Sequence, residues 1–168
     1  FGQEEVISSM VDVIYAHQIR KPEDKVRPAS MFLVGSTGIG KSEMAKAITE
    51  KLFKDESLLL NLSMGEVHNE YLMNEKVFGT PHGDPTEFEQ FVKSNERTGG
   101  VILWDEVSNM GGSNLAQKDQ LFKMLYGLTE EGTWTPPNES DPIDLSKFVF
   151  IFTGNDGEKL FSGISADD

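Results

Sequence analysis

The stretch GSTGIGKS occupies residues 35–42 and follows the short apolar run SMFLV of residues 30–34. It matches the pattern G-x-x-x-x-G-K-[ST], which forms a phosphate-binding turn between a strand and a helix. Glycines permit positive φ angles and let the backbone come close to an anion. Successive N–H groups and the positive end of the following helix then face the phosphates. The stretch therefore predicts a strand, a nucleotide-binding turn and a helix in succession.

Two side chains of this turn carry predicted chemical roles. Lys41 would place a cation on the β- and γ-phosphates, which makes it a candidate catalytic residue, and the Ser42 hydroxyl would be a ligand of Mg²⁺. The residues expected to contact the nucleotide are Gly35, Ser36, Thr37, Gly38, Ile39, Gly40, Lys41 and Ser42. The alternative is a glycine-rich surface turn that holds no ligand.

Apolar runs alternate with helical periodicity along the rest of the chain. The runs predict buried strands over residues 30–34, 57–62, 101–104 and 148–152. The periodicity predicts helices over residues 3–19, 41–53, 65–76, 86–94 and 114–128, with a loop over 79–85 and a hairpin or irregular crossing over 132–146. Apolar strands that alternate with helices favour a parallel sheet covered on both faces. We expect an α/β fold of the P-loop NTPase kind, a three-layer sandwich in which helices flank a mainly parallel sheet.

Polar side chains follow two of the predicted strands. Asp105 and Glu106 come directly after the run 101–104, and Asn155 follows the run 148–152. The carboxyl ends of the strands in an open α/β sheet are where ligands bind. We expect Asp105 to hold Mg²⁺, Glu106 to act as the general base on the attacking water, and Asn155 to position water or touch the γ-phosphate. The alternatives are a solvated loop at the two acids and an ordinary turn at Asn155.

Composition restricts the class of protein. The chain has 168 residues, which suits one domain, and its 28 acidic and 15 basic residues give a net charge of −13. This charge makes non-specific nucleic-acid binding unfavourable. The sequence has no cysteine, which excludes disulfides and thiolate chemistry. It also has no run near the roughly 20 apolar residues of a membrane span. We expect a cytoplasmic domain without membrane or nucleic-acid partners, and the missing initial Met indicates a piece of a longer protein.

Nearly all of the chain resembles the large ATPase subdomain of AAA+ proteins, most closely the second ATPase module of the Clp-type unfoldases and disaggregases. The Asp105-Glu106 pair looks like the Walker B acids of that family. Phe1-Gly2-Gln3 is similar to the family's I-G-Q box, and LSMGEV over 62–67 is similar to its I-D-M-S-E-Y stretch. LFKMLYGLTEEG over 121–132 looks like the family's helix that ends in L-L-Q-V-L-D-D-G, and FIFTGN over 150–155 looks like its sensor-1 strand, I-I-M-T-S-N.

The resemblance implies a set of properties. Residues 1–168 would be the large nucleotide-binding subdomain, and the small helical lid would lie outside this chain. The nucleotide would be ATP or ADP with Mg²⁺, with Phe1 and Gly2 beside the adenine. The full-length protein would be a homo-oligomeric ring, a hexamer, that couples ATP hydrolysis to remodelling of a protein substrate.

This sequence departs from the family at three places. Val67 stands where the family's I-D-M-S-E-Y stretch ends in Tyr. The family threads its substrate with an aromatic loop reading G-Y-V-G, whereas residues 79–85 read GTPHGDP without Tyr. The alternative function is therefore a nucleotide-dependent scaffold that binds ATP without threading substrate. The family's arginine finger and sensor-2 arginine follow the sensor-1 strand, and no arginine follows Arg97 here. We expect this fragment alone to hydrolyse ATP weakly.

Other enzymes with the same phosphate-binding turn fit less well. A GTPase would need an N-K-x-D guanine motif, which Asn155-Asp156 does not supply. A nucleotide kinase would need an arginine-rich lid, and the charge disfavours an ATPase that acts on DNA.

Overall fold

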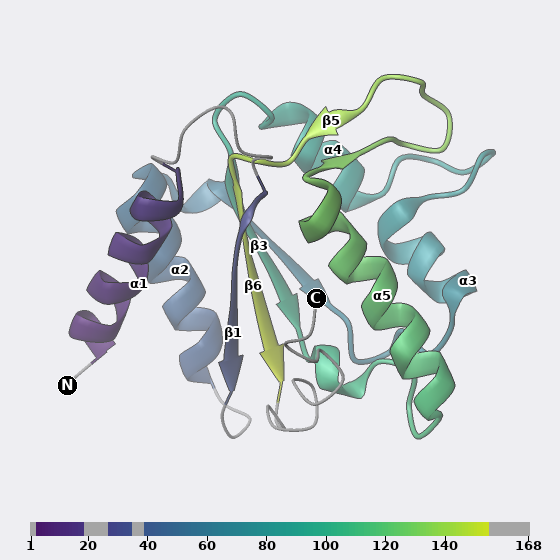
Figure 1. Cartoon of the computed structure of the whole chain (residues 1–168), viewed down its shortest axis with the longest axis horizontal. Coiled ribbons are helices and arrows are strands. Elements are labelled where there is room, and N and C mark those ends of the chain that lie inside the picture. The colour runs from purple at the N-terminus through teal and green to yellow at the C-terminus, as the bar shows by residue number, and fades with distance from the viewer. Residues whose placement is uncertain (1–2, 19–26, 35–38, 155–168) are drawn as a thin grey trace.

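The computed structural model describes residues 3–18, 27–34 and 39–154, and these form three layers (Figure 1). A parallel sheet lies in the middle. Helices α1 (Gln3–Gln18) and α2 (Ile39–Phe53) cover one face, and α3 (Glu70–Met73), α4 (Glu87–Ser94) and α5 (Leu115–Glu131) lie on the other side. The predicted α/β sandwich is confirmed in the described part of the chain.

The sheet has four described strands in the order β1-β6-β3-β2, and each pairs parallel with its neighbour. They are β1 (Ala29–Val34), β2 (Leu59–Ser63), β3 (Gly100–Asp105) and β6 (Phe148–Gly154). Strand β6, the last in sequence, lies between β1 and β3. The carboxyl ends of β1, β6 and β3 are therefore adjacent along one edge of the sheet.

The two inner strands are apolar on both faces because a separate core packs on each side. Val101 and Leu103 of β3 belong to the core under α1 and α2. Ile102 and Trp104 of the same strand belong to the core under α4 and α5. All four side chains are fully buried. This alternation is the pattern expected of a strand covered on both sides.

The prediction of buried strands is wrong for the two outer ones. Val34 in β1 is 52% exposed, and Asn61 in β2 is also exposed, because each strand pairs on one side only within the described sheet. The second strand also begins later than predicted. Asp55 Oδ1 accepts a hydrogen bond from the Ser57 backbone N–H at 2.9 Å, which caps the 3₁₀ turn η1 (Glu56–Leu58) ahead of β2.

The helix predicted over residues 65–76 is shorter and begins later. Asn69 caps α3, since its side chain accepts from the Leu72 N–H at 2.9 Å. The helix then widens into a π-helical turn, η2 (Asn74–Phe78), and ends at Gly79 with a φ of 80°. The loop predicted over residues 79–85 is confirmed.

The hairpin alternative for residues 132–146 is confirmed. Gly132, in the left-handed conformation, ends α5, and the short strands β4 (Thr133–Trp134) and β5 (Ile143–Asp144) pair antiparallel. The Trp134 ring packs against Phe88 of α4 at a centroid distance of 5.0 Å. This contact fixes the hairpin to the core.

No helix among the described residues is long and apolar enough to cross a membrane.

Thr86 offers a test of how α4 is held. Its buried hydroxyl donates to the Val77 carbonyl at 2.6 Å and accepts from the Glu89 N–H at 3.2 Å, so it joins the start of α4 to η2. We expect Thr86→Ala to lower the free energy of unfolding by about 1–2 kcal/mol, the usual cost of losing such a cap. Thr86→Ser keeps the hydroxyl and loses only the γ-methyl group, so it should cost less than Thr86→Ala. Urea denaturation followed by circular dichroism would measure both, and equal losses would contradict a role for the hydroxyl.

Candidate nucleotide-binding site

The first turn of α2 lies beside the carboxyl end of β6. Lys41, two residues into the helix, donates from Nζ to the Gly154 carbonyl oxygen at 3.2 Å. Gly154 is the last residue of β6. The contact places the side chain of the predicted phosphate-binding lysine against the end of β6, the strand that pairs with both β1 and β3. Ser42 follows Lys41 in the same turn and is partly buried.

A buried threonine connects the ends of β3 and β6. The Thr153 hydroxyl donates to Oδ1 of Asp105, the last residue of β3. The same hydroxyl oxygen accepts a hydrogen bond from the Glu106 backbone N–H at 3.0 Å. Thr153 is 1% exposed, whereas both acids are partly exposed. The two predicted functional acids are therefore tied to β6 and yet accessible.

Glu106 has an unusual backbone conformation. Its φ of 60° and ψ of 39° lie in the left-handed region, and the chain then turns into the 3₁₀ turn η3 (Val107–Asn109). A residue with a Cβ pays roughly 1–2 kcal/mol for this conformation, which persists only where the surroundings fix it. Such strain is concentrated at functional sites.

The Glu106 side chain extends towards the segment that follows β2. An ideal Cβ built on Gly65 would lie 2.6 Å from Glu106 Oε2, so the carboxylate occupies the space that a side chain at position 65 would need. The Met64 N–H also donates to the Asp105 carbonyl at 2.8 Å. The segment after β2 thus lies directly against both acids.

The donor set at this edge suits Mg²⁺. This ion is usually held by one or two carboxylates together with substrate phosphates and water, and not by a full protein cage. Asp105 at the end of β3 has a carboxylate of that kind, and the Ser42 hydroxyl lies in the first turn of α2, next to Lys41. Among the residues that the structure describes, no group of three or more His, Asp or Glu side chains is arranged to hold a metal.

The structure thus brings three of the predicted site residues, Lys41, Asp105 and Glu106, to neighbouring strand ends. Asn155, Phe1, Gly2 and residues 35–38 lie outside the described residues, as does the Ile39 side chain. Thr153 is not among the site residues that the sequence predicts. A signal was present, since Thr153 is the hydroxyl side chain of an otherwise apolar or glycine strand, Phe148–Gly154.

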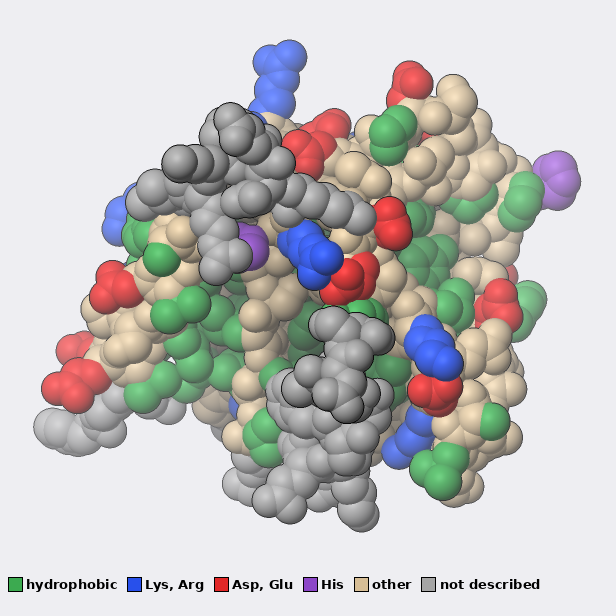
Figure 2. Space-filling view, viewed as in Figure 1, with side chains coloured by type: hydrophobic (Ala, Val, Ile, Leu, Met, Phe, Trp, Pro, Cys, Tyr) green, Lys and Arg blue, Asp and Glu red, His purple; other side chains and the backbone are tan. Residues whose placement is uncertain are grey.

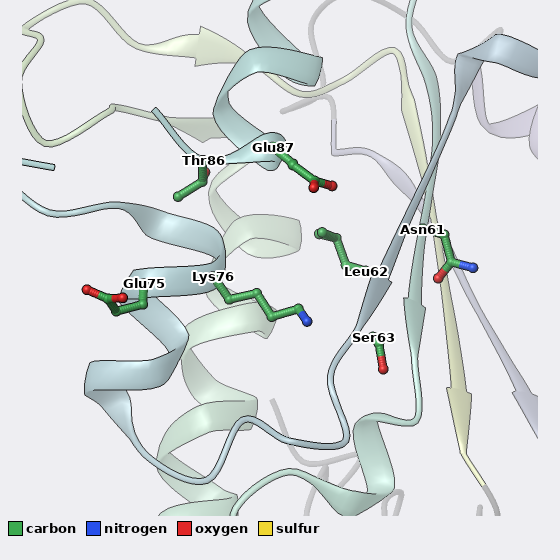
Figure 3. Close-up of a pocket in the computed structure, with 7 residues that line it drawn as sticks. All are labelled: Asn61, Leu62, Ser63, Glu75, Lys76, Thr86 and Glu87. Atoms are coloured by element: carbon green, nitrogen blue, oxygen red, sulfur yellow. The ribbon is translucent and has the colours of Figure 1, made fainter. Parts of the chain in front are cut away.

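A separate cavity lies along the outer side of β2. It has a volume of about 420 Å³ and is lined by Asn61, Leu62, Ser63, Glu75, Lys76, Thr86 and Glu87. Figure 3 shows the Lys76 side chain extending from η2 towards β2, while Glu75 points away. None of the lining residues is among the predicted nucleotide or metal ligands.

Comparison with known proteins decides the family. The model of the AAA domain (Cdc48 subfamily) matches residues 27–166. The chain belongs to this AAA family. The Chaperone protein ClpB 1 of Synechococcus elongatus is 28% identical over 170 residues, which cover 99% of this chain and 18% of that protein. The ClpB of Bacteroides thetaiotaomicron is 29% identical over 159 residues, which cover 93% of this chain and 17% of that protein.

A solved structure agrees with this family. The S. cerevisiae Hsp104–ADP complex superposes with a TM-score of 0.69 at 26% identity, over 99% of this chain and 28% of that chain. The AAA chain described here is thus a Clp-type ATPase module. It spans less than a fifth of the length of the ClpB relatives that it matches, 18% for the Synechococcus elongatus protein.

Proposed function

We propose that this module binds ATP with Mg²⁺ and hydrolyses it, and that its parent protein uses the turnover to remodel a protein substrate. The observation that carries the proposal is the arrangement at the ends of β3 and β6. There Lys41 contacts Gly154, and the next residue inward, Thr153, contacts Asp105 and Glu106. A phosphate-binding cation and a pair of acids at adjacent strand ends are the parts that ATP hydrolysis needs.

Each predicted site residue has a definite task in this proposal. The N-terminus of α2 and the Lys41 ammonium group would bind the phosphates, together with residues 35–40 of the turn. Lys41 would exchange its hydrogen bond to the Gly154 carbonyl for one to phosphate oxygen, which carries more negative charge. Ser42 and Asp105 would hold Mg²⁺, which neutralises charge on the phosphates when bound. Phe1 and Gly2 would lie beside the adenine.

Glu106 would remove a proton from the attacking water. Its backbone is anchored by the hydrogen bond to Thr153, and its carboxylate is partly exposed, so water can reach it. Asn155 follows β6 directly and would orient the same water or contact the γ-phosphate. A general base in this position typically contributes a factor of roughly 10²–10⁴ to the rate.

The names of the relatives suggest which partners the parent protein has. ClpB is named a chaperone protein, and Hsp104 was solved with ADP. We propose that the parent protein is likewise a chaperone, acts in the cytoplasm as a homo-oligomeric ring, a hexamer, and receives an arginine for the transition state from a neighbouring subunit. Nucleic acid is disfavoured by the net charge of −13, and Figure 2 shows acidic side chains interspersed with the basic ones on one face.

The loop over residues 79–85 favours the second candidate function, a nucleotide-dependent scaffold. It contains no Tyr, Phe or Trp with which to grip a polypeptide. It is also short, since it runs from the end of η2 at Phe78 to the cap of α4 at Thr86. Unfolding of a tagged substrate by the full-length parent with ATP would exclude the scaffold, and hydrolysis without unfolding would support it.

The role of Lys41 can be tested by Lys41→Ala. We expect the variant to lose at least about 100-fold in ATP affinity, or ~2.7 kcal/mol, because a cation on the phosphates is removed. Isothermal titration calorimetry with ATP and Mg²⁺ would measure the loss. Lys46→Ala is the matched control, since Lys46 lies on the same helix and forms an exposed ion pair with Glu43. Equal affinities for the two variants would contradict the assignment.

The role of Glu106 can be tested by Glu106→Gln in the full-length parent. The amide keeps the shape of the side chain but cannot take a proton, so ATP binding should stay within about twofold while turnover falls at least 100-fold. A steady-state phosphate-release assay beside a binding titration would separate the two effects. Glu56→Gln in the exposed turn η1 is the control. Hydrolysis by Glu106→Gln at the wild-type rate would refute Glu106 as the base.

A further inference from the structure

The segment Thr153-Gly154 contacts Lys41, Asp105 and Glu106, three of the described residues to which we assign the chemistry. Thr153 hydrogen-bonds both acids through one hydroxyl, and the Gly154 carbonyl accepts from Lys41 Nζ. Both residues are buried and both belong to β6, which pairs with β1 and β3. A displacement of this segment would therefore move the acids and the lysine together.

The direction of the hydrogen bonds at Thr153 follows from the chemistry of the groups. A backbone N–H can only donate, so the Glu106 N–H occupies a lone pair of the Thr153 hydroxyl oxygen. The hydroxyl hydrogen is then directed at Oδ1 of Asp105. One carboxylate oxygen of Asp105 is held in this way, which leaves Oδ2 for another ligand. Only a side chain that donates and accepts through one atom, such as a hydroxyl, can make both of these hydrogen bonds.

Packing leaves Thr153 little freedom. Its β-branched side chain is stiff at χ1, and the residue pairs with Leu33 in the register of β1 and β6. The next residue, Gly154, lies so close to η3 that a Cβ there would be 3.1 Å from Ser108 Cβ and 3.1 Å from Phe32 Cζ. The turn from Asp105 to Ser108 is thus packed tightly against the end of β6.

We propose that Thr153 is a positioning residue for the acidic pair. Its hydroxyl orients the Asp105 carboxylate towards Mg²⁺ and holds the left-handed turn at Glu106, so that the base is presented in one conformation. The proposal rests on the roles of Asp105 and Glu106 proposed above. A role in stability alone would have a different signature, because the effect of losing the hydroxyl would then not depend on Mg²⁺ or on the turnover step.

Thr153→Val tests the proposal, because valine has nearly the same shape and lacks the hydroxyl. In the full-length parent we expect kcat to fall at least tenfold and the Mg²⁺ concentration for half-maximal rate to rise at least threefold. Thr153→Ser keeps the hydroxyl and should stay within about twofold of wild type. Thr129→Val is the matched control, since the Thr129 hydroxyl is also hydrogen-bonded, to the Tyr126 carbonyl at 2.8 Å, but lies on α5 away from the acids.

A second measurement does not depend on hydrolysis. Amide hydrogen exchange in the nucleotide-free parent should be at least tenfold faster at the Glu106 N–H in Thr153→Val than in wild type or Thr153→Ser. Exchange at the Val101 and Leu103 amides of β3 should change much less. If Thr153→Val does not fold, Thr153→Ala removes the same hydroxyl with less bulk and is judged by the same criteria.

Two results would overturn the proposal. One is a Thr153→Val protein with wild-type kcat and Mg²⁺ dependence, whatever its amide exchange. The other is a kcat loss that Thr153→Ser or the control Thr129→Val shares. Glu106→Gln, assayed in parallel, keeps the two proposals apart. Full turnover by Glu106→Gln would refute the base assignment, while faster exchange at the Glu106 amide in Thr153→Val would still locate the anchor at Thr153.

Discussion

The parallel pairing of β6 with β1 on one side and β3 on the other is the constraint on which the rest of the structure depends. Residues 148–154 are the last described part of the chain, yet they occupy the space between the strand before α2 and the strand that ends in Asp105. This insertion makes the start of α2 and the end of β3 neighbours of one strand. It also closes both cores, because Phe148 and Phe150 face one side and Val149 and Ile151 the other.

The buried faces of the sheet give the site its rigidity. Trp104 precedes Asp105 directly, is fully buried, and packs against Phe88 and Phe150 at centroid distances of 5.5 and 5.6 Å. Large rings packed in this way hold the end of β3 in place. A strand held so firmly can support the left-handed conformation at Glu106 one residue beyond Asp105. The packing of Trp104 in the core thus stabilises the strained backbone at Glu106.

The family relation and the geometry support each other at different levels. The AAA match and the resemblance to ClpB and Hsp104 give the class of ATPase. The hydrogen bonds of Lys41, Asp105 and Glu106 show how this chain arranges the residue types that such an ATPase uses. The short loop over residues 79–85 lacks the aromatic residues of the family pattern, and it lies on the connection between η2 and α4.

The sequence by itself determined the fold class, because a phosphate-binding turn after an apolar run and apolar strands that alternate with helices admit few other architectures. It also placed Asp105 and Glu106 at a strand end, since the apolar run stops there. The exposure of Val34 and Asn61 was not predictable, because it depends on which strands are outermost in the sheet, and the order of the strands cannot be read from local composition. Thr153 and the left-handed Glu106 were likewise settled by tertiary structure alone. The sequence does not show which group a hydroxyl in an apolar strand will bond. The Thr153 hydroxyl and the Glu106 N–H are 47 positions apart in the chain, and they meet only because β6 pairs with β3.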